Sequence, residues 1–561
     1  MNGELSWLAS LKRTYIGNAT ATRDMRVQLR GGRAAIFFTL YLVVMTVVLL
    51  LIYSGSLGED GQYNLAMAQG RLQDFYNQTL LLLAVVISLV APSMGAFAIV
   101  SEKQRRSLDL VFSAPTEPKY YLVGKLISSF RYVWLVLVLS LPFCAVSVTL
   151  GGTTWSQLFI TFILYSMYGL VCVSFGLLMS SLCSKVLPAI IWTYAALIGY
   201  LVVTGGLLSA SSMSGTGALS TINPVFSLNP FCYSYIADQN WPVFGRDIPT
   251  WILSILMHLL VVKFVVLSAG SLLAPGNSKE IRSLRIHALI YSAAITFLIA
   301  VSVGPYIRSY MGSSYRVGFG SFSAQEGLQI VHGRALFGLL FAVGILVVPY
   351  LASFGFNDLR RHRPDGMFNL RQTFSGRPSG HLPFLLLVFL VTFLAYSFGG
   401  VSTFVGTSFI PFSGSMARVS AGDFHPLSPY YLMYAFLILS IWLTAYFLGW
   451  YSSSRTPILS RGRTFALFFF VLGLILPTAI FAIVSPEDSR TATGIWAINP
   501  IAGVICDIQA AKITGIHSVI LMCIAVLLMV LTAPRVAKLA SHGFESRLKV
   551  RDDSSKEIPA L

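Results

Sequence analysis

The chain has 561 residues, of which 55% are hydrophobic and only 11% are charged, and its mean hydropathy is +0.73. Soluble domains carry about a quarter charged residues, so this composition excludes a string of soluble domains and indicates a polytopic membrane protein. The formal net charge of +17 could suit a nucleic-acid-binding protein, but the basic residues are distributed along the chain as membrane topology requires.

The first 33 residues are polar and basic, and the first apolar run follows them directly, so we expect no cleavable signal peptide. Apolar runs of about 20 residues are long enough to cross a bilayer as helices. We therefore expect an all-α polytopic protein with twelve membrane spans. They are predicted at 34–53, 79–100, 128–150, 157–182, 186–208, 250–273, 286–305, 335–356, 382–405, 428–451, 464–484 and 516–533.

The loops between these runs predict an orientation. The two terminal segments and every second loop together hold 29 Lys and Arg residues, whereas the remaining loops hold 8. Cytoplasmic loops carry an excess of Lys and Arg. We therefore expect both termini on the cytoplasmic side, the lipid bilayer as the surrounding medium, and no nucleic-acid partner.

The twelve spans predict two six-span halves, 34–273 and 286–533, joined by a short basic connector at 274–285. The segment 1–33 would lie at the membrane surface, and 534–561 would form a basic cytoplasmic tail. Asn-Pro pairs stand in equivalent last external loops, at Asn223–Pro224 and at Asn499–Pro500. The alternative is that two hydrophobic halves look alike without being a repeat.

The segment Ser101–Lys125, after the second span, has eight charged residues and two prolines. Its apolar residues predict a short helix along the membrane surface, with Pro115 and Pro118 ending it and a second helix beginning near Tyr120. Five charged residues would stay in water: Glu102, Lys103, Arg105, Arg106 and Asp109. The alternative is a solvated loop whose charges only fix topology.

This segment, "SEKQRRSLDLVFSAPTEPKYYLVGK", resembles the signature segment of type-2 permeases of the ATP-binding-cassette superfamily. The family pattern is a Glu closing span two, a basic stretch, a Thr-Leu-Asp/Glu-Leu-Leu core, a Ser/Thr-x-Pro turn and a terminal Gly-Lys. Ser107 replaces the Thr, and Arg106 stands where the family often has Gly. The start "NATATRDMRVQLRGGRAAIFFTLYLVV" also looks like the family's N-terminal elbow, and the resemblance covers residues 17–273.

The resemblance implies that the segment couples the permease to cytosolic ATPases. The implied coupling residues are Glu102, Arg105, Arg106, Ser107, Leu108, Asp109, Phe112, Pro115, Gly124 and Lys125. The equivalent loop of the second half lacks the Glu, the Leu-Asp-Leu core and the Gly-Lys. Its implied contacts are Arg360, Arg361, Arg363 and Asp365.

A phosphate-binding loop needs the pattern Gly-x-x-x-x-Gly-Lys-Ser/Thr, so that backbone amides can surround the phosphates. The one Gly-Lys pair, Gly124–Lys125, is followed by Leu126 and has no Gly five residues earlier. We therefore expect no enzyme activity and no bound cofactor in this chain, with ATP and Mg²⁺ used by separate ATPase subunits. The sequence does not indicate the substrate of the expected exporter.

The resemblance also implies short re-entrant helices between the last two spans of each half, which would place Asn223, Pro224, Asn499 and Pro500 at an outer gate. A plain ordered loop is the alternative. Cys232 and Cys506 stand in equivalent external loops and could form a disulfide, although their spacing alone does not place them within bonding distance. Span six contains His258 and Lys263, which we place on one helix face. One interpretation is that they contact an anionic head group of the substrate. The alternative is that the Lys263 side chain extends to the cytoplasmic interface.

Two other classes are compatible with parts of the pattern. A twelve-span secondary transporter also has two six-span halves, although no intramembrane acidic relay is visible here. A polytopic glycosyltransferase would need external acidic residues, for which Glu59–Asp60 is the one candidate pair. Short loops favour a prokaryotic inner membrane.

Overall fold

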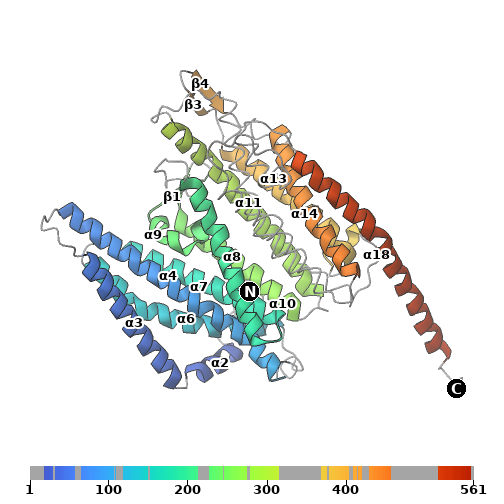
Figure 1. Cartoon of the computed structure of the whole chain (residues 1–561), viewed down its shortest axis with the longest axis horizontal. Helices are drawn as coiled ribbons and strands as arrows, with labels where there is room; N and C mark the ends of the chain where they lie inside the picture. Colours follow the sequence, from blue (N-terminus) through green and yellow to red (C-terminus); the bar gives the residue numbers. More distant parts are fainter. Residues whose placement is uncertain are drawn as a thin grey trace, which may run out of the picture. The chain divides into compact units, whose positions relative to one another are not determined.

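The structure is a computed structural model, and its described part is almost entirely helical (Figure 1). The chain divides into two compact units, Met1–Gly215 with Ile222–Ala274 and Thr216–Thr221 with Pro275–Leu561. The described residues are 18–29, 32–56, 65–106, 108, 118–149, 152–212, 226–243, 246–273, 278–314, 368–375, 378–403, 408–412, 415–419, 429–455 and 516–556.

The first unit is built from long apolar helices. Their bounds are α2 Ala19–Leu29, α3 Gly32–Ser56, α4 Leu65–Gln104, α6 Pro118–Thr149, α7 Trp155–Leu182, α8 Val186–Ser212 and α10 Thr250–Leu273. Short elements connect α8 to α10: η2 Phe226–Leu228, η3 Pro230–Cys232, α9 Tyr233–Ile236, and the antiparallel pair β1 Asn240–Val243 and β2 Arg246–Pro249. The all-α expectation did not include this hairpin.

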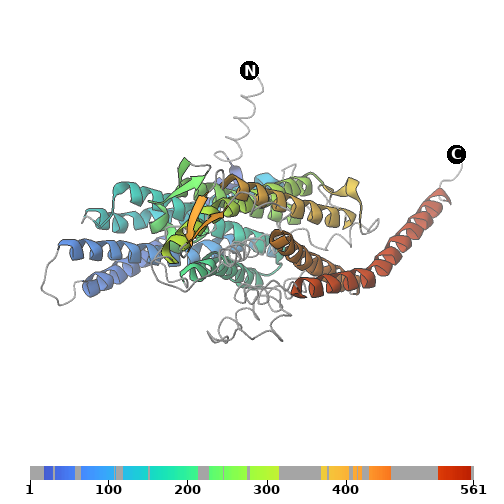
Figure 2. The ribbon, with the colours of Figure 1, turned by 90° about the horizontal axis from the view of Figure 1, so that it is seen from above.

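The second unit is described in part. Its elements are α11 Ser278–Ser314, η5 Leu370–Gln372, η6 Pro378–Gly380, α13 His381–Thr403, β3 Ser408–Phe412, β4 Ser415–Val419, α14 Pro429–Arg455 and α18 Ile516–Lys556. The residues from Ser278 that were assigned to a connector form the first turns of α11. The predicted tail likewise continues the last span as one helix, α18, which bends along its length in Figure 2 and contains Pro534.

Ten of the twelve predicted spans coincide with described helices, and the runs 335–356 and 464–484 lie outside the described residues. Seven helices in the described part are long and apolar enough to cross a membrane. Three shorter apolar helices accompany them, Ala35–Leu51, Val186–Leu201 and Ala435–Tyr451. The described helices therefore support an integral, multi-pass membrane protein.

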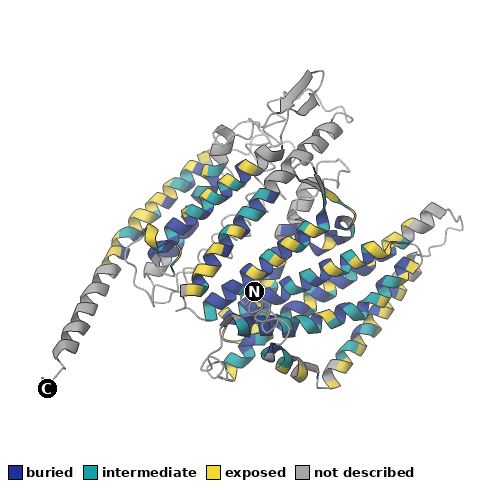
Figure 3. Ribbon diagram, turned by 180° about the vertical axis from the view of Figure 1, so that it is seen from behind, coloured by how far each residue is buried: buried dark blue, intermediate teal, exposed yellow. Residues whose placement is uncertain are grey.

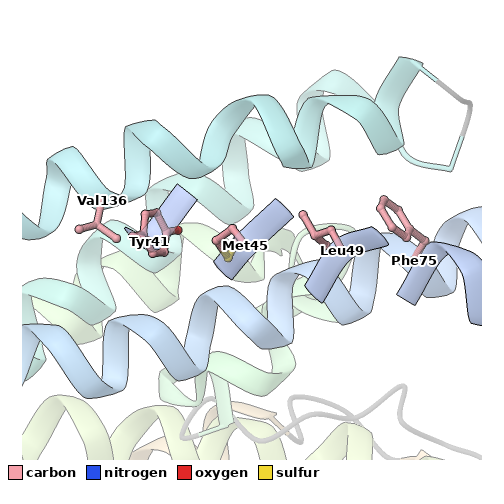
Figure 4. Close-up of a cluster of buried hydrophobic side chains, with 5 residues drawn as sticks. All are labelled: Tyr41, Met45, Leu49, Phe75 and Val136. Carbon is pink, nitrogen blue, oxygen red and sulfur yellow. The ribbon is translucent and has the colours of Figure 1, made fainter. Parts of the chain in front are cut away.

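Helix α3 packs on α4 and α6 through side chains one helical turn apart. Tyr41, Met45 and Leu49 form a buried cluster with Phe75 of α4 and Val136 of α6 (Figure 4). The Tyr41 hydroxyl also bonds the Ser140 hydroxyl of α6. Lipid is as apolar as these side chains, so close packing and polar contacts, rather than expulsion of water, hold α3 in place.

Helices α4 and α7 approach each other most closely at two glycines. A Cβ on Gly176 would lie 2.5 Å from the Pro92 carbonyl oxygen and 2.6 Å from the Ala96 backbone nitrogen. Gly95 in turn faces the backbone of Val173, Gly176 and Leu177. Small residues allow two membrane helices to pack backbone against backbone, so α4 and α7 form a tight pair.

Buried and exposed residues alternate along the outer helices in the pattern expected of lipid-facing segments (Figure 3). Helix α18 exposes a series of large apolar side chains, including Val519, Leu527 and Val530. Helix α8 does the same with Leu187, Ile191 and Ile198. Such apolar surfaces on spanning helices suit contact with hydrocarbon.

The α3 cluster gives a direct test of packing. Met45 is fully buried, so Met45→Ala should lower the free energy of unfolding by about 2 kcal/mol through the lost contacts and the cavity left behind. Met529→Ala removes the same atoms from a side chain that is 45% exposed and should change little. Unfolding of both purified variants in increasing sodium dodecyl sulfate would compare them, and equal losses would contradict the packing described.

Candidate functional site: a charged cluster joining three helices

All four ion pairs found among the described residues meet in one group, here named the Lys125 cluster: Arg23, Asp24, Glu102 and Lys125. The Lys125 ammonium lies 2.6 Å from Asp24 Oδ2 and 2.7 Å from Glu102 Oε1. The Arg23 guanidinium lies 3.0 Å from an oxygen of each carboxylate. The four charges balance, and they come from helix α2, the end of α4 and the start of α6.

The cluster is withdrawn from water at its centre. The Lys125 side chain is 6% exposed and the two carboxylates 14%, whereas Arg23 is 56% exposed. Tyr121 adds a hydroxyl that donates to Glu102 Oε2 at 2.6 Å. Burial acts to lower the pKa of Arg23, but hydrogen bonds and charge from Asp24 and Glu102 raise it above its usual value. Withdrawing such charges from water is tolerated because they are mutually paired.

The helix α2 is positioned on α6 by Asn18 and Gly124. Asn18 Oδ1 accepts from the backbone nitrogens of Thr20 and Ala21, which caps α2, and Asn18 Nδ2 donates to the Tyr120 carbonyl at 3.0 Å. A Cβ on Gly124 would lie 2.5 Å from Asn18 Oδ1. The Gly-Lys pair thus has a structural reason: the glycine admits α2, and the lysine next to it joins the carboxylates.

A left-handed residue, Arg106, follows two positions after the end of helix α4, where the family pattern often has glycine. Arg106 has φ 55° and its backbone nitrogen donates to the Lys103 carbonyl at 3.1 Å. Arg105 and Arg106 are both exposed. The unusual φ closes the helix and sends the chain into the following segment, a conformation that costs a non-glycine residue about 1–2 kcal/mol.

Lys103 does not stay in water as the sequence predicted. Its ammonium reaches the carbonyl oxygens of Ser180, Ser181 and Cys183 at 3.1, 2.5 and 3.2 Å. These carbonyls end helix α7, whose negative dipole end favours a cation. The expectation is also wrong for Glu102, which faces Lys125 and Tyr121. Both side chains instead bind the helices together.

Of the other predicted coupling residues, the structure describes one and leaves four outside the described residues. Leu108 is half-buried, and Ser107, Asp109, Phe112 and Pro115 lie outside the described residues. Pro118, expected to end the surface helix, is instead the first residue of α6, where its missing N–H is not needed. The second helix therefore begins two residues before Tyr120, close to the prediction.

The link between α8 and α10 folds into short helices whose polar groups enter the bundle. Asn229 caps η3 through the Phe231 backbone nitrogen and donates to Thr204 Oγ1 of α8 at 3.2 Å. Asn223 and Pro224, chosen from the sequence, lie outside the described residues, as do Asn499 and Pro500. The sequence analysis did not select Asn229–Pro230, although this second Asn-Pro pair follows the first by six residues in the same predicted external loop.

Tyr165 connects this link to the long helices. Its hydroxyl lies 3.0 Å from the Leu80 carbonyl oxygen of α4 and 3.1 Å from the Pro230 carbonyl oxygen of η3. The Tyr165 ring meets the Tyr233 ring edge to face at 5.0 Å. Nothing in a single tyrosine of an apolar run distinguishes it from ordinary core, so the sequence could not identify this residue.

His258 and Lys263 do not share a helix face, which corrects the sequence assignment. His258 is fully buried, with Nε2 2.8 Å from the Tyr233 hydroxyl and Nδ1 2.7 Å from the Ser254 carbonyl. Lys263 is exposed. A spacing of five residues turns a helix well past one full turn, so the two side chains diverge.

In the second unit, Arg360, Arg361, Arg363 and Asp365 lie outside the described residues. A buried residue that the sequence analysis missed, Arg285 of α11, reaches the Thr373 carbonyl at 2.6 Å.

Cys232 is a buried free cysteine, and its suggested partner Cys506 lies outside the described residues. The described residues hold no group of three or more potential metal ligands.

Gly124→Ala tests the close approach of α2. The added methyl group would lie 2.5 Å from Asn18 Oδ1 and 2.9 Å from Thr20 Cβ, so we expect a loss of about 1–3 kcal/mol and faster amide exchange in α2. Gly199→Ala is the matched control, because a Cβ there has no atom within 4 Å. Hydrogen–deuterium exchange measures both, and unchanged exchange in α2 would contradict the contact.

Lys125→Met tests the charge balance. Removing one partner leaves Asp24 and Glu102 close together and withdrawn from water, so we expect a loss of about 3 kcal/mol. Lys263→Met makes the same change at an exposed lysine and should leave the stability nearly unchanged. Thermal unfolding in detergent is the measurement. A Lys125 variant as stable as the Lys263 variant would show that the cluster is dispensable.

The comparisons with known proteins bear on the same region. No curated protein sequence matches the chain. Residues 55–269 match the model of a family described as ABC-2 family transporter protein. The match covers less than half of the chain; it contains Glu102, Gly124, Lys125, the helices α4 to α9 and most of α10. Over residues 55–269 the chain is thus similar to membrane proteins of ABC-2 type transporters.

Proposed function

We propose that this chain is the permease subunit of an ATP-driven exporter and that separate ATPase subunits engage the segment 107–117. The observation that carries the proposal is the Lys125 cluster. Glu102 stands just before this segment and Lys125 just after it, and their side chains meet at 2.7 Å. A segment held at its base in this way can pass a force from its tip to the helices on both sides.

The base of the segment is stiff for three physical reasons. The ion pairs fix α4 to α6, Tyr121 adds a hydrogen bond to Glu102, and Asn18 ties α2 to the Tyr120 carbonyl. A buried ion pair costs about 3–5 kcal/mol to break by loss of one partner. A movement imposed on 107–117 would therefore carry α2, α4 and α6 together.

A path toward the other end of the unit runs through α4 and α7. Lys103 and Ser180 join these helices at one end, since Ser180 Oγ accepts from the backbone nitrogens of Ile99 and Val100 at 3.0 and 2.8 Å. Gly95 and Gly176 keep the backbones in contact further along. Tyr165 then joins both helices to Pro230 of the short-helix link. We infer that this path couples the ATPase to an outer gate.

ATP and Mg²⁺ would be bound by the partner subunits, and this chain would form the substrate pathway. The proposal places the segment 107–117 on the cytoplasmic side, as the Lys and Arg distribution predicts. It also places the protein in a prokaryotic cytoplasmic membrane. Among the predicted coupling residues that the structure describes, Arg105 and Arg106 are exposed and available to an ATPase, whereas the charges of Glu102 and Lys125 are used within the unit.

Charge reversal tests this assignment. Arg105→Glu with Arg106→Glu should weaken association with the ATPase subunit at least about tenfold, because attraction across the contact becomes repulsion. Co-purification and a binding titration with the ATPase expressed from a neighbouring gene are the measurements. The variant should remain folded, since both side chains are exposed.

Lys538→Glu is the control, because it reverses an exposed charge on α18 of the second unit. It should bind the ATPase as the unmodified chain does. Undiminished binding and ATPase stimulation by the Arg105/Arg106 variant would remove the basis of the proposal. The same result would favour the alternative hypothesis of an ion-coupled secondary transporter.

A further inference from the structure

A short turn in the second unit exposes apolar side chains next to a membrane span. In this 368–375 turn, Phe368 is 51% exposed, Leu370 68% and Phe374 37%. Arg371 lies among them and is also exposed. Three large apolar side chains and a cation are thus exposed together within seven positions, a combination that suits a medium with both apolar and charged groups.

The turn is a built structure with its own hydrogen bonds. Asn369 Oδ1 accepts from the Arg371 backbone nitrogen and caps η5. The Asn369 backbone nitrogen donates to the Ser379 carbonyl at 3.0 Å, which closes the loop just before α13. Gly380 packs directly on the Gln372 backbone, where no side chain would fit. The exposed residues are therefore presented from a fixed base.

Arg285 of α11 anchors the turn from beneath. Its side chain is fully buried, and Nη1 donates to the Thr373 carbonyl at 2.6 Å. Its Nη2 lies 2.7 Å from His381 Nδ1, and because a guanidinium only donates, the imidazole must accept there. The guanidinium also stacks over the Phe384 ring at 5.3 Å. Arg285 thus fixes the turn to the first residues of α13.

The apolar surface of the turn leads directly into a span. Helix α13 begins at His381, and His381–Phe398 is apolar enough to cross a membrane. Its exposed residues Leu386, Leu390 and Leu394 recur every four positions and form one face. A turn that immediately precedes a membrane-spanning helix is expected near the boundary between hydrocarbon and head groups.

We propose that the 368–375 turn is a membrane-surface anchor that inserts Phe368 and Leu370 among the head groups of anionic lipids. Aromatic and aliphatic side chains favour this interface, and a cation beside them pairs with lipid phosphates. The surrounding sequence, 357–381, contains five Arg and Lys residues and two Asp, which complements an anionic leaflet. The inference stands apart from ATPase coupling.

Depth of immersion is the direct test. Leu370→Cys in the full chain, with the six native cysteines replaced, would carry a nitroxide into vesicles of phosphatidylcholine and phosphatidylglycerol. Power saturation then compares collisions with oxygen and with a soluble nickel chelate. We expect an oxygen-to-nickel ratio at least about threefold above that of an aqueous reference at Arg105→Cys, approaching a lipid reference at Leu390→Cys.

The same experiment separates the competing occupants. A ratio at 370 equal to the Arg105 reference would overturn the proposal, and so would a label shielded from both reagents only when the ATPase is added. Vesicles without phosphatidylglycerol should show a lower ratio if Arg371 pairs with anionic lipid. Arg285→Met should also lower it by releasing the turn, with Arg285→Lys retaining part of the effect, and an unchanged ratio in Arg285→Met would overturn the anchoring role.

Discussion

The interaction on which the first unit depends is the double bridge from Lys125 to Asp24 and Glu102. One ammonium group with little contact with water joins α6 to the end of α4 and to α2, which is far away in the sequence. Membrane helices gain little from the hydrophobic effect in lipid, so such polar contacts and close packing decide how their ends are arranged. The bridge also explains the residue types at two neighbouring positions. Gly124 lets α2 approach α6, and Tyr121 donates a hydrogen bond to the second carboxylate oxygen of Glu102.

The second unit uses a different polar device at a comparable place in its predicted order of spans. A residue early in its first helix, Arg285, contacts the entrance of α13 through carbonyl oxygens and an imidazole. No carboxylate takes part in the Arg285 contacts that the described residues show. The two contacts that the described residues show therefore differ in chemistry: carboxylates face Lys125, whereas carbonyl oxygens and an imidazole face Arg285.

The sequence predicted the helices well because long apolar runs have few alternatives in a bilayer. The resemblance to a family pattern singled out Glu102, Gly124 and Lys125 as coupling residues, a role that stays a prediction. It did not point to Asp24, Asn18 or Tyr121, which surround them in the structure. Those partners lie up to about a hundred positions away, and only the fold brings them together. The prediction that Glu102 and Lys103 stay in water failed for a related reason: a charged residue at a helix end looks solvated until its partner helix is known. The β1–β2 and β3–β4 hairpins were missed because the loops containing them have no marked alternation.

The central claim is that Lys125 makes α2, α4 and α6 one body. The most direct measurement is the distance distribution between nitroxides at Arg26 of α2 and Gln104 of α4, both exposed positions, recorded by pulsed electron resonance. The account predicts a single narrow distribution in the unmodified chain, unchanged when nucleotide binds the ATPase partner, and a broad one in Lys125→Met. Distributions of equal width in the two chains, or a shift on nucleotide binding, would contradict it.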